Sequence, residues 1–81
     1  MTLKLAKQEK NAKPKTITLE EIEKELEKND GQKIFYFEHD NPHKEMNALV
    51  EHFEDKGYSV YLKTVRFGLD ENDYIYEVHI L

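Results

Sequence analysis

The fold is decided by residues 33–81, which read KIFYFEHDNPHKEMNALVEHFEDKGYSVYLKTVRFGLDENDYIYEVHIL. A helix is predicted over 42–56, in the middle of this segment. Its apolar side chains recur at i, i+3, i+4 and i+7, the spacing that builds one apolar stripe along a helix. These side chains are Met46, Leu49, Val50 and Phe53. Such a stripe has to pack on an apolar sheet, and the flanking segments predict one.

Three strands are predicted around this helix. Residues 33–39 and 58–67 are rich in β-branched and aromatic residues, and the polar turn 68–73 leads into a third such run, 74–81. The first strand is apolar at every central position, which is typical of a strand that is interior to its sheet or buried on both faces. These positions are Ile34, Phe35, Tyr36 and Phe37.

A second helix is predicted over 19–29. Thr18 and Glu21 form a capping box at its start, and Gly31 supplies a left-handed stop after its end. Asn41 and Pro42 are expected to cap and begin the central helix, with Gly57 ending it.

Together these elements predict an α+β fold, a small two-layer α/β sandwich in the order α-β-α-β-β. The strand–helix–strand unit predicts a βαβ crossover, and the short turn predicts a C-terminal hairpin, giving a mixed sheet of three to four strands. The fourth would be an N-terminal edge strand, because Leu3 and Leu5 alternate with polar residues.

The length of 81 residues allows one domain. Residues 1–16 hold five lysines and one glutamate, and are predicted to form a basic, flexible arm. Residues 17–81 are predicted to form a single acidic domain, with seven Lys and Arg against sixteen Asp and Glu, a balance of −9. An acidic body of this kind attracts basic surfaces and repels nucleic acid.

The sequence excludes several kinds of chemistry. It has no cysteine, which rules out disulfides and thiolate zinc sites. No apolar run approaches the length of a membrane span, and the N-terminal residues do not resemble a secretory signal, so the expected location is the cytoplasm.

The best candidate for a metal site is the loop 38–43, with two histidines and two carboxylates. Its spacing matches no compact metal site, and His43 falls in the first turn of the predicted helix. Ser59, the only serine, lacks a glycine elbow, and the three glycines form no phosphate-binding loop. We therefore expect a protein that is not an enzyme and that uses no metal or cofactor.

The charge balance favours a protein-interaction role. The expected partner is a basic protein, such as a DNA-binding protein. The acidic surface would bind this partner and inhibit it by mimicking DNA, as phage-encoded proteins do with proteins of their host. No direct contact with nucleic acid or membrane is expected, and the protein is either a monomer or a homodimer. The predicted partner-binding acids are Glu20, Glu23, Glu27, Asp30, Glu51, Glu54, Asp55, Asp70, Glu71 and Asp73.

Two alternatives stay open. One is a nucleic-acid-binding module that combines the sheet aromatics with the basic arm. The arm lysines are Lys4, Lys7, Lys10, Lys13 and Lys15. The other is a homo-oligomeric structural module, in which the strand 74–81 pairs at the sheet edge with its symmetry mate.

Overall fold

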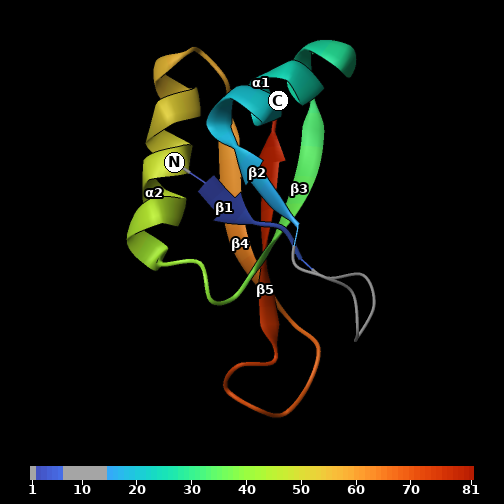
Figure 1. The fold of residues 1–81 in the computed structure, drawn as a ribbon, viewed down its shortest axis with the longest axis vertical. Coiled ribbons are helices and arrows are strands. Elements are labelled where there is room, and N and C mark those ends of the chain that lie inside the picture. Colours follow the sequence, from blue (N-terminus) through green and yellow to red (C-terminus); the bar gives the residue numbers. More distant parts are fainter. Residues whose placement is uncertain (1, 7–14) are drawn as a thin grey trace.

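The computed structural model describes residues 2–6 and 15–81. Helices and strands follow in the order β-β-α-β-α-β-β (Figure 1). Their bounds are β1 Thr2–Lys4, β2 Thr16–Thr18, α1 Leu19–Lys28, β3 Lys33–Glu38, α2 His43–Asp55, β4 Val60–Arg66 and β5 Tyr74–Ile80. The predicted α+β class and the order α-β-α-β-β of the main elements are confirmed. In the part of the chain that is described, no helix is long and apolar enough to cross a membrane.

Local sequence signals fix the helix ends. The predicted capping box is present at α1, where the Thr18 hydroxyl accepts from the Glu21 amide and the Glu21 carboxylate accepts from the Thr18 amide. Gly31 and Gly57 adopt the left-handed region with φ of 78° and 95°, so both predicted stops are confirmed. The predicted Asn41 cap is wrong. Pro42 occupies the N-cap position of α2 and no side chain caps it.

The main sheet has the order β3-β5-β4, and both pairings are antiparallel. β3 and β4 therefore run parallel to each other, as a strand–helix–strand crossover requires, but β5 lies between them. The sheet is antiparallel rather than mixed for this reason. The same order overturns the oligomer model based on residues 74–81, because β5 is the central strand of this sheet and has no free edge.

The N-terminal strand is part of the fold. β1 pairs antiparallel with β2, Leu5 forms a bridge to Phe37, and the Ala6 amide donates to the Tyr36 carbonyl. The predicted N-terminal strand is thus present, but it pairs with β2 in a separate two-stranded sheet and is not a fourth strand of the main sheet. Leu3 is completely buried in the core, so residues 2–6 belong to the folded unit and not to the predicted flexible arm.

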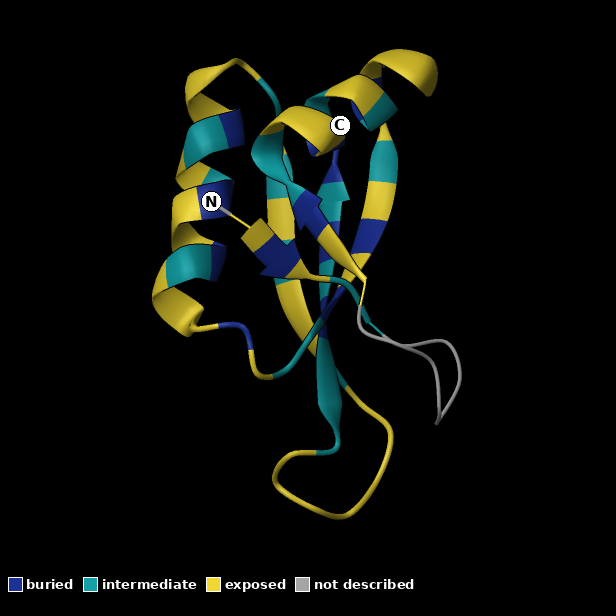
Figure 2. Cartoon of the chain, viewed as in Figure 1, coloured by how far each residue is buried: buried dark blue, intermediate teal, exposed yellow. Residues whose placement is uncertain are grey.

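One core lies between the helices and one face of the sheet, which we call the inner face (Figure 2). The inner face contributes Phe35, Phe37, Tyr76, Val78 and Ile80, and these pack with Leu3, Ile17, Ile22, Leu26, Met46, Leu49 and Phe53. The opposite, outer face is partly exposed. The expectation that the first strand is interior to its sheet or buried on both faces is therefore wrong, because β3 lies at an edge of the three-stranded sheet and both helices contribute to the inner-face core.

Candidate functional site

Helices α1 and α2 are joined by one carboxylate. The Glu23 carboxylate on α1 lies 3.1 Å from His52 Nε2 on α2 and forms an ion pair with Lys56 just beyond the end of α2. Hydrogen bonds from Lys56 and then from His52 hold the pKa of Glu23 below its ordinary value, against the opposing effect of desolvation. Glu23 therefore stays ionised at neutral pH and links the two helices.

Further acids surround this link. Glu20 and Glu27 lie three residues before and four after Glu23, which places them on the same side of α1. Glu51 and Asp55 lie four residues apart on α2, beside His52. All four are exposed, and no cation within residues 2–6 and 15–81 forms an ion pair with them. We call Glu20, Glu23, Glu27, Glu51 and Asp55 the acidic crest.

The other predicted acids are not part of the crest. Glu54 lies about 200° round α2 from His52, which directs it away from α1. Asp30 follows α1 in the left-handed turn, with φ of 57°. The turn acids Asp70, Glu71 and Asp73 lie at the opposite end of the long axis, which measures 36 Å (Figure 1).

Two of these turn acids shape their own loop. The Asp73 carboxylate accepts from the Asp70 amide, and the Asp70 carboxylate accepts from the Asn72 amide. They are thus engaged locally, as is usual for aspartate in turns. Of the ten predicted acids, three share one side of α1, two share one side of α2, and the other five lie elsewhere.

The lysines of the predicted arm have separate positions. Lys4 Nζ donates to Asp40 Oδ2 at 3.0 Å, an exposed ion pair that lowers the pKa of Asp40. Lys15 is exposed. The predictions for Lys7, Lys10 and Lys13 lie outside the described residues.

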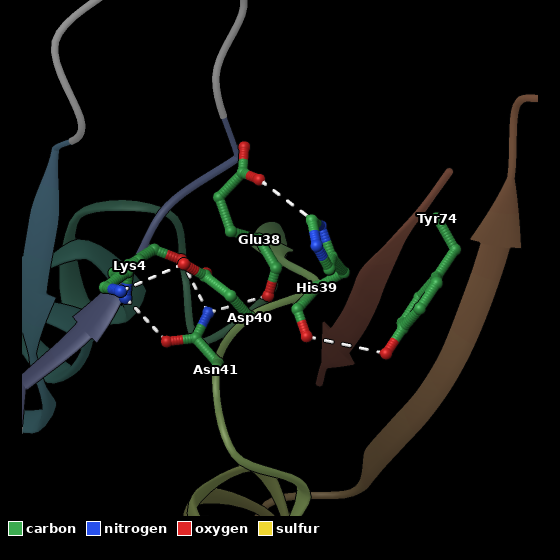
Figure 3. Close-up of polar contacts among 6 residues, drawn as sticks. All are labelled: Lys4, Glu38, His39, Asp40, Asn41 and Tyr74. Carbon is green, nitrogen blue, oxygen red and sulfur yellow. Dashed lines mark hydrogen bonds and ion pairs between the residues drawn. The ribbon is translucent and has the colours of Figure 1, made fainter. Parts of the chain in front are cut away.

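The loop considered for metal binding instead holds the N-terminal strand (Figure 3). Asn41 is buried; its side chain accepts from the Lys4 amide at 2.9 Å and donates to the carbonyls of Lys4 and Glu38 at 2.8 and 2.9 Å. The His39 carbonyl accepts from the Tyr74 hydroxyl at 3.5 Å. Across residues 2–6 and 15–81, no three His, Asp or Glu side chains are grouped so that they could hold a metal ion.

The outer face of the sheet is a second candidate surface; the sequence had indicated its aromatic residues only as a platform for nucleic acid, and not the charged residues between them. The strand register places Tyr36, Glu77 and Lys63 in one row across the sheet, and Ile34, His79 and Tyr61 in the next. Ile34, Tyr36 and Tyr61 are 44%, 45% and 61% exposed. Exposed apolar side chains that adjoin in this way are typical of interaction sites.

A carboxylate lies at the centre of this face. Glu77 Oε2 is 3.2 Å from Lys63 Nζ, and Glu77 Oε1 is 3.0 Å from His79 Nε2. The Glu77 side chain is only 14% exposed, whereas that of Lys63 is 62% exposed. Burial alone would raise the pKa of Glu77, but the neighbouring His79 and Lys63 together outweigh it and lower that pKa.

A family model named HP0268 matches residues 1–81, which is the full sequence. The chain belongs to the HP0268 family. No curated protein and no solved structure matches it. The HP0268 designation names no activity, ligand or partner.

Proposed function

We propose that this protein binds a basic surface on another protein through the acidic crest, and that it does so in the cytoplasm. One observation carries this function. Four crest acids, Glu20, Glu27, Glu51 and Asp55, are exposed without a cationic partner among the described residues, around a fifth that links the two helices. Because Glu23 joins α1 to α2, the crest acids are held on adjoining helices.

The crest is suited to electrostatic docking. Lys24 lies four residues after Glu20 and three before Glu27, so it borders the crest on α1, but in the part of the chain that the structure describes it forms no ion pair with either acid. Exposed charges of one sign raise association rates with an oppositely charged partner, and salt weakens this effect. A DNA-binding protein is one class of partner with the required charge, and occupying its nucleic-acid site would inhibit it.

A competition experiment tests this function. A purified nucleoid protein is bound to a labelled DNA duplex, and release of the DNA by the acidic protein is followed by fluorescence anisotropy. We expect competition at roughly 50 mM salt and its loss at roughly 500 mM. The crest variant carries Glu20→Gln, Glu27→Gln, Glu51→Gln and Asp55→Asn, and should compete at least about tenfold less well.

The matched control removes the same number of charges away from the crest, with Asp30→Asn, Glu54→Gln, Asp70→Asn and Glu71→Gln. It should compete like the unmodified protein. Equal losses in the two variants would mean that net charge alone drives binding, and the crest would not be the docking surface.

A second function is favoured by a specific observation. Tyr36 and Tyr61 are exposed on the outer face near the cation Lys63, and exposed aromatics on a sheet can stack nucleic-acid bases. A mobility-shift assay with single-stranded RNA and DNA separates the two functions. A shift that Tyr36→Ala and Tyr61→Ala abolish would support nucleic-acid binding, whereas the crest function predicts no shift.

A further inference from the structure

The outer face differs from the acidic crest in the environment of its carboxylate. The crest acids are mostly exposed to water, which weakens any ion pair they form. Glu77 is largely shielded, with 14% of its side chain exposed, and it is flanked by the more exposed Tyr36 and Tyr61. Electrostatic attraction is stronger where water is partly excluded, so Glu77 can contribute more per charge than a crest acid.

The two tyrosines are placed to contact a ligand above Glu77. Tyr36 and Glu77 are direct register partners, and Tyr61 is the register partner of His79, two residues along β5. Tyr36 and Tyr61 are two strands apart, which is roughly 10 Å across the sheet. Tyrosine rings attract cations through their faces, and a carboxylate between them adds a direct charge.

One of the two present partners of Glu77 is replaceable. His79 side-chain exposure is 30%, and its ring lies on the same strand as Glu77. Lys63 is 62% exposed on β4 and reaches Glu77 with a long side chain, so it can move into solvent at little cost. Its departure frees Glu77 Oε2 for another cation while His79 stays beside Oε1.

We propose that the outer face binds an arginine or lysine side chain of the partner, placed over Glu77 between Tyr36 and Tyr61 with Lys63 displaced, and that neighbouring apolar residues of the partner cover Ile34. This inference deepens the proposed function, since it rests on a basic partner. The outer face would thus add a second contact to the electrostatic attraction of the crest, and this contact would select the partner by its shape and by its fit to aromatic rings. Arginine is a better ligand than lysine because its planar guanidinium can stack on an aromatic ring and pair with a carboxylate at the same time.

The test uses two capped peptides and NMR titration of the full chain. One peptide is Val-Thr-Arg-Thr-Val, and the other carries neutral citrulline in place of arginine. We expect the arginine peptide to shift the ring resonances of Tyr36 and Tyr61 and to bind at least about fivefold more tightly than the citrulline peptide. Glu77→Gln and Tyr61→Ala should each weaken the arginine peptide by about tenfold.

Lys63→Ala gives the most discriminating result. It removes the internal competitor for Glu77, so the arginine peptide should bind several-fold more tightly. Lys44→Ala, on α2, makes the same change in net charge away from this face and should leave the affinity unchanged. Tyr61 and Lys63 are exposed on the edge strand β4, so these variants should stay folded.

Three results would overturn this inference: equal affinity for the two peptides, equal effects of Lys63→Ala and Lys44→Ala, or ring shifts caused by a single-stranded oligonucleotide and not by the peptide. The crest experiment remains independent. If the crest variant loses competition while Glu77→Gln leaves peptide binding unchanged, only the outer-face inference fails. If the peptide binds as expected and the crest variant still competes fully, the crest function fails instead.

Discussion

The two faces of the β3-β5-β4 sheet both carry aromatic and aliphatic side chains, yet only the inner face is covered by helices. Phe35 and Phe37 alternate along β3 with Ile34 and Tyr36, and the first pair is buried while the second is about half exposed. The same composition therefore serves two purposes. Inner-face residues hold the domain together, and outer-face residues are free to contact another molecule, so substitutions on the two faces should have different consequences.

The largest difference is expected between neighbours on β3. Phe37→Ala removes a fully buried ring and should lower the free energy of unfolding by about 3–5 kcal/mol. Tyr36→Ala, one residue earlier, should cost less than about 1 kcal/mol because the side chain is exposed. Urea unfolding followed by circular dichroism measures both. Similar losses would mean that the outer face is also covered.

The N-terminal strand β1 contributes a side chain to the inner core. Leu3 is fully buried, so Leu3→Ala should cost about 2–4 kcal/mol in unfolding free energy. Leu69→Ala changes the same residue type at a fully exposed position in the 67–73 turn, and should be neutral in the same assay. If Leu3→Ala proved neutral, residues 2–6 would not be part of the core in solution.

Substitutions in the loop that holds β1 against the inner core should cause a smaller loss of unfolding free energy. Asn41→Ala leaves the Lys4 amide without its acceptor and should cost about 1–3 kcal/mol. The adjacent Asp40→Ala removes only the exposed pair with Lys4 and should cost less than about 1 kcal/mol. Amide hydrogen exchange at Lys4 reports the same contrast, because Asn41→Ala removes the acceptor of this amide and should speed its exchange, whereas Asp40→Ala should not.

The smallest effects on stability should come from two adjacent residues, Tyr76 and Glu77, whose contributions to the free energy of unfolding change in opposite directions with pH. The pKa of Glu77 is lowered in the folded state, so its contribution is present above the ordinary value of 4.5 and is lost as pH falls through the folded value. The pKa of Tyr76 is raised by burial and then by the neighbouring Tyr74, so its contribution is lost as pH rises above the ordinary value of 10.0.

Thermal unfolding across pH separates these two contributions. Glu77→Gln should reduce the loss of stability at acid pH only, and Tyr76→Phe should reduce the loss of stability at alkaline pH only. A change on the wrong side would show that the pKa directions are misassigned.

Local features of the sequence predicted the elements well. The capping box at Thr18, the glycine stops and the apolar stripe of α2 each depend on residues within one or two helical turns, so their physical cause is visible in the sequence. β2 was missed because three residues are too short to show alternation. Asn41 was misread as a cap because its partner, Lys4, lies 37 residues away.

The strand order and the open face could not be predicted from local pattern. The alternation of apolar and polar residues along a strand indicates which side chains share a face. It does not indicate which strands pair or where the helices pack. Glu77 gave no signal for the same reason. Its partners Lys63 and His79 lie on two strands whose register exists only in the folded sheet, while the crest acids were visible because their spacing is helical.

The central position of β5 has a consequence for the order in which the domain forms. β3 and β4 do not pair with each other, and both depend on Tyr74–Ile80, the last strand in sequence. During synthesis β3 and β4 lack their shared sheet partner until that strand has been made and has left the ribosome. The helices have only local requirements and can form sooner, so the nascent chain exposes apolar strand residues until the final strand closes the sheet.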